Sequence, residues 1–159
     1  MAKIKAFIVT VSDSRTLDND RSGDRLAQLL LESAAEVAGK LIVPDELESL
    51  RNTIYSLTER DDINLIITTG GTGFGPRDNT PEATHAVIQR EAPGLAEAMR
   101  RETATKTPLA MLSRGICGIR GDKLIVNLPG SPKAVEECLA VIQPVLLHAV
   151  TLISGDTEH

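Results

Sequence analysis

Aromatic side chains are almost absent from this chain of 159 residues: they make up 2% of it, namely Phe7, Tyr55 and Phe74, and there is no tryptophan. Proteins that bind single-stranded nucleic acids stack bases on such rings. A basic excess is also missing, since 17 lysines and arginines stand against 22 acidic residues and give a net charge of −5. The chain has no positive field to neutralise phosphates, so we expect no nucleic-acid partner.

Cysteine and histidine are equally scarce. The chain has two cysteines, Cys117 and Cys138, and three histidines, His85, His148 and His159. Their spacing matches neither a zinc ribbon nor a disulfide framework. No side chains are arranged as a Ser-His-Asp or Cys-His nucleophile, so covalent catalysis has no support in the sequence.

Long apolar segments are limited to one stretch near the C-terminus. Residues 138–155 carry no formal charge, but Gln143, Pro144 and His148 interrupt the stretch, and its apolar residues recur at helical spacing. This pattern predicts a core helix and no membrane span. The N-terminus shows no apolar signal core, and we therefore expect a cytoplasmic protein with no membrane partner.

The rest of the composition is that of an ordinary globular protein, with 42% hydrophobic and 25% charged residues. A chain of this length can build one self-sufficient core. No repeat, low-complexity tract or linker interrupts it. We expect one domain over residues 1–159.

Strand-like and helix-like segments alternate along the chain. Apolar, β-branched runs predict buried strands at residues 3–12, 40–43 and 64–69. Helical periodicity predicts helices over 22–39 (capped by Ser22), 46–59, 80–90, 94–105 and 131–153, the last kinked or offset by Pro144. Residues 116–128 read as a hairpin that turns at Gly121. The order predicts an α/β fold: a three-layer α/β/α domain with a mostly parallel sheet and an added hairpin.

Two glycine turns follow strands at the predicted carboxyl edge of the sheet, where ligands of such folds bind. Residues 70–75 contain four glycines and lead to Thr80-Pro81, a helix cap followed by proline. Residues 127–132 repeat the design, from Asn127 to the cap Ser131. Each turn alone is equally consistent with a simple tight turn, but two at one edge favour a polyanion site. Neither matches a Walker or a dinucleotide pattern.

Carboxylates also follow the first three strands: Asp13, Asp45 and Asp78. A single aspartate at such a place is explained by the preference for turns and caps. Acids beside a phosphate site repel the ligand unless a cation lies between them, and Mg²⁺ commonly binds one or two protein carboxylates plus substrate phosphates. We therefore interpret Asp45 and Asp78 as candidate catalytic residues and ligands of a magnesium–nucleotide complex.

Several strings of the sequence carry a resemblance that covers roughly residues 7–153. They are VSDS, DRSG, VPDE, TTGGTGFGPRDNTPEAT, EAPGLAEAM, MLSRG, GIRG and NLPGSPKAVEECL. Together they resemble the molybdenum-cofactor biosynthesis family of bacterial Mog and the gephyrin-type G domains. The long glycine string is its most specific part.

The resemblance implies a three-layer α/β fold and a molybdopterin adenylyltransferase, which uses Mg²⁺ and ATP to adenylylate molybdopterin and releases pyrophosphate. It also implies a homotrimer and a molybdenum-inserting partner enzyme. Non-catalytic relatives of the MoaB type can lose the acids equivalent to Asp45 and Asp78, which this chain retains in VPDE and PRD. A non-catalytic molybdopterin-binding or scaffold protein of the same fold is the alternative.

The residues and the resemblance together give a set of candidate contacts to substrate or nucleotide. Arg77 either neutralises ligand charge or forms a surface pair, and Phe74 either covers a ring or plugs an apolar gap. The substrate- and nucleotide-binding candidates are Ser12, Asp13, Asp20, Ser22, Gly23, Gly70, Gly71, Thr72, Gly73, Arg77, Asn127, Pro129, Gly130, Ser131 and Lys133.

Overall fold

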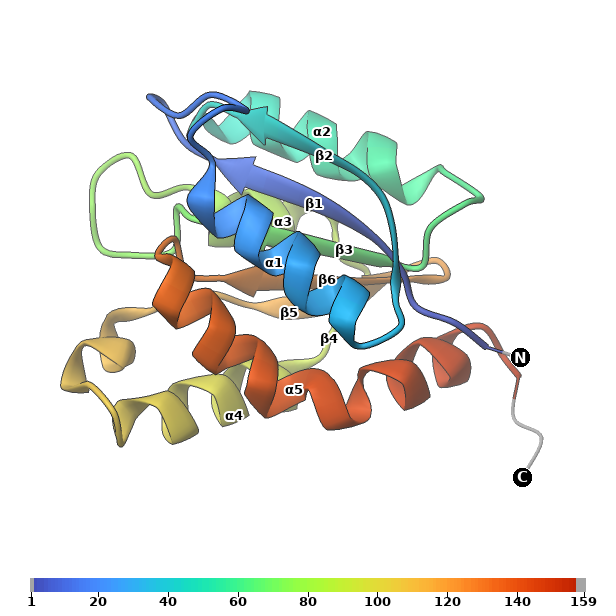
Figure 1. Cartoon of the computed structure of the whole chain (residues 1–159). Coiled ribbons are helices and arrows are strands. Elements are labelled where there is room, and N and C mark those ends of the chain that lie inside the picture. The colour runs from blue at the N-terminus through green and yellow to red at the C-terminus, as the bar shows by residue number, and fades with distance from the viewer. Residues whose placement is uncertain (1, 157–159) are drawn as a thin grey trace.

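The computed structural model describes residues 2–156 and contains one mixed sheet of six strands. The strands lie in the order β2-β1-β3-β6-β5-β4 (Figure 1). They are β1 (Lys5–Val11), β2 (Glu36–Val43), β3 (Leu65–Thr69), β4 (Arg90–Glu91), β5 (Cys117–Arg120) and β6 (Lys123–Leu128). Strands β2, β1, β3 and β6 are parallel, and β5 is antiparallel to both of its neighbours. The α/β class, the mostly parallel sheet and the hairpin of β5 and β6 are confirmed.

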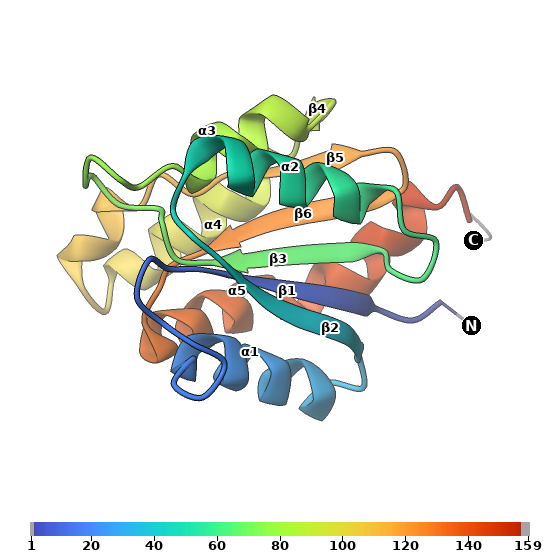
Figure 2. The same cartoon turned by 90° about the horizontal axis from the view of Figure 1, so that it is seen from above.

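Helices cover both faces of this sheet (Figures 1 and 2). They are α1 (Arg21–Glu32), α2 (Leu47–Thr58), α3 (Thr80–Val87), α4 (Pro93–Ala104) and α5 (Pro132–Ile153), with a short 3₁₀ helix η1 (Pro108–Leu112) after α4. Alternate residues of one strand point to opposite faces, so Ile8 packs with α1, α4 and α5, whereas Val9 packs with α2 and α3. Two apolar cores result, one on each face, and the predicted three layers are confirmed.

The predicted first helix is wrong at both ends. It ends at Glu32 instead of Gly39, because Ala34 adopts a φ of 64° and turns the chain into β2. Val37, which fits the helical spacing, and Gly39, the expected helix end, lie in that strand next to Ala6 and Phe7. The N-cap is Asp20, whose carboxylate accepts the Gly23 N–H. Ser22 lies inside the helix, so its predicted capping role is wrong.

Three smaller differences concern the second half of the chain. Helix α3 ends at Val87, and Ile88 is extended, so that residues 90–91 form β4 instead of a last helical turn. Asn79 is the N-cap of α3, not Thr80. The 3₁₀ helix η1 has no counterpart in the prediction.

Helix α5 matches the predicted C-terminal helix, including its cap Ser131 and the internal Pro144. It is long and apolar enough, by length and composition, to cross a membrane. In the structure, one of its faces packs into the larger core through Val135, Leu139 and Leu146.

Candidate functional site

The candidate site lies where the chain reverses its direction across the sheet. From β1 the chain crosses to β2, which lies on one side of β1. It then returns to β3 on the other side of β1, and β6 lies next to β3 in the sheet. The carboxyl ends of β1 and β3 are therefore adjacent while their connections diverge, which is the position where open α/β sheets bind ligands. The segments after Val11, Thr69 and Leu128 all begin at this edge.

A pocket of about 490 Å³ opens between the two glycine turns. The first turn contributes Gly71, Thr72 and Gly73 together with Asp78. The second contributes Asn127, Pro129, Gly130 and Ser131. The expectation that both turns meet at one edge is therefore correct. The opposite wall comes from α4, η1 and the start of α5.

Backbone donors of the first turn are available to a ligand. The N–H groups of Gly71, Thr72 and Gly73 have no acceptor within residues 2–156. Gly70 differs, because its N–H donates to the Leu128 carbonyl. The predicted anion contact therefore fits the N–H groups of residues 71–73 and not that of Gly70, whose φ of 100° serves the turn.

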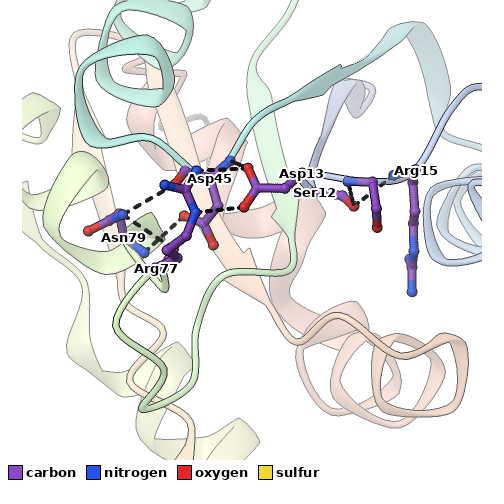
Figure 3. A network of polar contacts seen from close by, with 7 residues as sticks. Ser12, Asp13, Arg15, Asp45, Arg77 and Asn79 are labelled. Carbon is purple, nitrogen blue, oxygen red and sulfur yellow. Dashed lines mark hydrogen bonds and ion pairs between the residues drawn. The ribbon is translucent and has the colours of Figure 1, made fainter.

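Asp45 lies against the same turn although it follows β2. It is 7% exposed, and its Oδ1 accepts the Asn79 N–H at 3.0 Å (Figure 3). The N-cap of α2 is Glu46 and makes no side-chain cap bond, so Asp45 does not serve as the helix cap. A methyl group on Gly71 would lie 2.8 Å from Asp45 Oδ2, which shows how closely the carboxylate approaches the turn.

Asp78 approaches the turn from its other end. Its Oδ2 accepts the Gly75 N–H at 2.8 Å and would lie 2.9 Å from a methyl group on Gly73. Burial raises the pKa of Asp45, and the charges of Asp78 and Asp13 raise it further, against the lowering effect of the Asn79 hydrogen bond. Carboxylates gathered in this way repel one another, and a cation between them would relieve that repulsion.

The donor set fits a magnesium ion carried by its substrate. No group of three or more His, Cys, Asp or Glu side chains suited to a metal occurs among residues 2–156, so the protein offers no complete cage. Two carboxylates beside free N–H groups match the way Mg²⁺ is held by one or two protein oxygens and by phosphates.

Arg77 and Asp13 form an ion pair in front of this turn. The Arg77 Nε and Nη2 donate to the two Asp13 oxygens at 2.8 and 3.0 Å (Figure 3). The Arg77 hydrogen bond lowers the pKa of Asp13, and the N–H of Asp45 donates to the same carboxylate. Of the two roles considered for Arg77, the surface pair is the one that the structure contains. Both side chains are exposed, and water screens such a pair, so its contribution to the stability of the fold is small.

The segment that carries the DRSG string lies largely in the interior. Asp20 is fully buried, and its Oδ2 accepts the Thr10 hydroxyl at 2.7 Å and lies 3.5 Å from Lys40 Nζ. Gly23 packs against the same carboxylate, because an added methyl group would lie 2.2 Å from it. Ser22 is buried and accepts a hydrogen bond from Arg15. The structure gives Asp20, Ser22 and Gly23 roles in folding the first loop.

Of the remaining candidates, some make hydrogen bonds inside the protein and others extend into solvent. Asn127 is 2% exposed, donates to the hydroxyls of Thr68 and Thr84 and accepts the Ile116 N–H. The Ser12 hydroxyl accepts backbone N–H groups of its own turn, including that of Arg15. Lys133 extends into solvent, 86% exposed. Phe74 is 68% exposed, so the apolar plug considered for it is wrong.

Arg114 is a site residue that the sequence analysis did not assign. Its Nε donates to the Gly73 carbonyl and its Nη2 to the Asp78 carbonyl, both at 2.8 Å. Its backbone N–H donates to the Thr72 carbonyl, and its guanidinium also pairs with Glu82. One side chain thus holds the first glycine turn from a segment about 40 residues later. The string MLSRG contained the signal, since it carried the resemblance but received no role.

Arg15 was also not assigned, and it lies directly after the string VSDS. Its Nη1 donates to the Ser22 hydroxyl at 2.7 Å and to the Gly130 carbonyl at 3.4 Å. It forms no ion pair with a carboxylate inside the described part of the chain. Arg15 therefore joins the loop after β1 to the second glycine turn.

Comparisons with known proteins agree with this architecture. Residues 7–148 match the family described as "Probable molybdopterin binding domain", and the chain belongs to that family. It is 44% identical, over 99% of its length, to the molybdenum cofactor synthesis protein cinnamon of Drosophila melanogaster, but it spans only 27% of that protein. It is 37% identical to the molybdopterin adenylyltransferase of Helicobacter pylori, covering 98% of this chain and 91% of that one.

The fold comparison gives the same family. The molybdopterin biosynthesis enzyme MoaB of Thermus thermophilus superimposes with a TM-score of 0.87 at 44% identity, over 96% of this chain and 97% of that one. Relatives named as adenylyltransferase and as MoaB are thus both similar to this chain. The resemblance inferred from the sequence strings is confirmed at the level of the family.

Proposed function

We propose that this protein is a molybdopterin adenylyltransferase, which converts ATP and molybdopterin to adenylylated molybdopterin and pyrophosphate. The observation that carries the proposal is the approach of two carboxylates, Asp45 and Asp78, to one glycine turn with free N–H groups. The bacterial relative that carries this activity in its name, and that this chain covers almost completely, supports it.

The reaction joins two polyanions. The terminal phosphate of the pterin attacks the α-phosphorus of ATP, and pyrophosphate leaves. The nucleophile is already an anion at neutral pH, so the site needs no general base. Positioning and charge neutralisation supply the catalysis.

Each part of the site has a place in this scheme. The N–H groups of residues 71–73 bind phosphate or carbonyl oxygens, and Gly130 and Ser131 of the second turn line the other side of the pocket. Asp45 and Asp78 would hold Mg²⁺, which screens the charge of the triphosphate when it is bound. Arg114 fixes the position of the turn relative to Asp78 through its hydrogen bonds to the Gly73 and Asp78 carbonyls.

The alternative is a protein that binds molybdopterin without chemistry, or one that gathers partners. The two retained carboxylates favour the enzyme. By resemblance we further propose a cytoplasmic homotrimer that delivers its product to a molybdenum-inserting enzyme.

A release assay tests the proposal. Purified protein is mixed with Mg-ATP and molybdopterin under anaerobic conditions, and pyrophosphate is measured. We expect pyrophosphate to appear only when both substrates and Mg²⁺ are present. Binding of molybdopterin without any pyrophosphate would instead establish the binding protein.

A further inference from the structure

One carboxylate of the pocket has no place in the scheme above. Glu137 lies on the first turns of α5 and lines the 490 Å³ pocket together with residues of α4, a lining that does not include Asp45. Its side chain is only 14% exposed. Its nearest cation is Lys133 Nζ at 4.0 Å, and that lysine is 86% exposed. A largely buried carboxylate without a hydrogen-bond partner in the described part of the chain can accept hydrogen bonds from a ligand in the pocket.

The carboxylate of Glu137 is open to the pocket. No residue within 2–156 donates a hydrogen bond to it. Every fully buried side-chain oxygen in that part of the chain has a hydrogen-bond partner, so the unpaired Glu137 oxygens are not fully buried. Because Glu137 lines the pocket, its carboxylate is available to a ligand bound there. The surrounding wall is mostly apolar, with Ala96, Met99 and Cys138 nearby in the lining. A flat ring fits such a wall, and a carboxylate at its edge orients the ring.

We infer that Glu137 is the specificity residue that recognises the pterin ring, so that α4 and the start of α5 hold the pterin. The inference rests on the proposed function. A carboxylate only accepts hydrogen bonds, and it accepts two in parallel. The 2-amino-4-oxo edge of a pterin offers two parallel donors, the amino N–H and the neighbouring ring N–H.

Adenine does not complement this carboxylate. On adenine the amino group, a donor, lies beside a ring nitrogen that can only accept a hydrogen bond. That ring nitrogen would face one of the carboxylate oxygens, which is also an acceptor. A site built around paired donors rejects an analogue that lacks them. Glu137 therefore separates the two substrates, and the adenylate belongs to the part of the site near Gly71, Asp45 and Asp78.

The test compares Glu137→Gln with Glu136→Gln. Glu136 is the neighbouring glutamate on the exposed face, where it pairs with Arg25, and serves as the matched control. Binding is followed by titration calorimetry, which requires no optical signal from the reduced pterin. Molybdopterin is titrated anaerobically into each protein, ATP binding and melting temperature are measured beside it, and pyrophosphate release is assayed.

We expect Glu137→Gln to weaken molybdopterin binding by about 10- to 100-fold, with unchanged ATP affinity and melting temperature. The preference for the phosphate ester of 6-hydroxymethylpterin over its lumazine counterpart, which has an oxygen in place of the amino group, should also shrink. The control should match the wild type in every measurement.

The outcomes separate the two ideas. Unchanged molybdopterin affinity in Glu137→Gln, with an active wild type, overturns the inference and leaves the proposed function. Equal loss of ATP and pterin affinity also overturns it. A wild type that binds molybdopterin but releases no pyrophosphate overturns the proposed function, while the affinity of Glu137→Gln still decides the inference. A wild type that binds no molybdopterin overturns both.

Discussion

The two glycine turns of this protein look alike in sequence and differ in what surrounds them. Both follow a parallel strand, and both lead to a helix with proline in its first turn. The first turn is flanked by Asp45 and Asp78 and held by Arg114. The second begins with the buried Asn127 and ends in an ordinary cap, where Ser131 Oγ accepts the Ala134 N–H. Glycine spacing thus locates a turn, and the side chains that reach it from elsewhere define its chemistry.

The strongest test of this difference removes the acids of the first turn. Asp78→Asn keeps an acceptor for the Gly75 N–H, so the fold should persist. We expect kcat to fall by about 10²- to 10³-fold at saturating Mg²⁺, because charge stabilisation of the transition state is lost. Asp45→Asn should behave similarly. Steady-state pyrophosphate release and melting curves check both variants.

The double variant sharpens the same test. If Asp45 and Asp78 share one ion, the loss of either already spoils the site, and the double variant should be scarcely slower than the worse single variant. Fully additive losses would contradict a shared ion. An active Asp45→Asn would remove Asp45 from catalysis, since the structure already excludes a capping role for it.

A second comparison replaces one glycine in each turn. Gly71 has a φ of 68°, and a methyl group there would lie 2.3 Å from Thr80 Oγ1. A methyl group on Gly130 would lie 3.3 Å from its nearest atom, the Gly70 Cα. The φ of Gly130 is not positive. We expect Gly71→Ala to lower the melting temperature by roughly 5–10 °C and to reduce turnover about tenfold or more by displacing Asp45.

Gly130→Ala provides the contrast within the second turn. We expect a smaller change in both melting temperature and turnover, because the neighbouring backbone must shift by only a few tenths of an ångström. Equal losses of melting temperature and turnover in Gly71→Ala and Gly130→Ala would show that the two turns tolerate an added methyl group equally.

The sequence predicted features that depend on local patterns and missed features that depend on the folded chain. Strand–helix alternation predicted the layers, because buried parallel strands have continuous apolar runs. The end of α1 was missed because Ala34, with no glycine to signal it, adopts a positive φ. Asp45 and Asp78 were found because they follow strands. Arg114 was not assigned, because it reaches the first turn from a segment that only the folded chain brings there. Glu137 follows the second turn closely in the sequence, but only the folded chain shows that it lines the pocket.

A third experiment asks whether Arg114 positions the first turn. Lysine offers a compact charge without a planar fork and cannot hold the Gly73 and Asp78 carbonyls together. We expect Arg114→Lys to lower kcat about 10-fold with a smaller change in KM, and Arg114→Gln to lower it further. Arg101→Lys on the exposed surface of α4 is the matched control. A change in stability without a change in kcat would leave Arg114 a purely structural role.

The smallest expected effect on turnover belongs to the second turn. Asn127→Ala removes the acceptor of the Ile116 N–H and the donor to the hydroxyls of Thr68 and Thr84. Leaving such buried groups unpaired should cost about 2–3 kcal/mol of unfolding free energy, with turnover per folded molecule within about threefold of wild type. Ser131→Ala should cost about 1 kcal/mol, because only a helix cap is lost.

Unfolding in urea and kcat/KM well below the melting temperature separate stability from catalysis in these two variants. If Asn127 is structural, the lost unfolding free energy is large while kcat/KM stays near that of the wild type. If its amide contacts the substrate instead, kcat/KM for molybdopterin falls by far more than threefold in protein that remains folded. That result would make the two glycine turns alike in chemistry as well as in sequence, and it would place a side chain of β6 among the binding groups of the site.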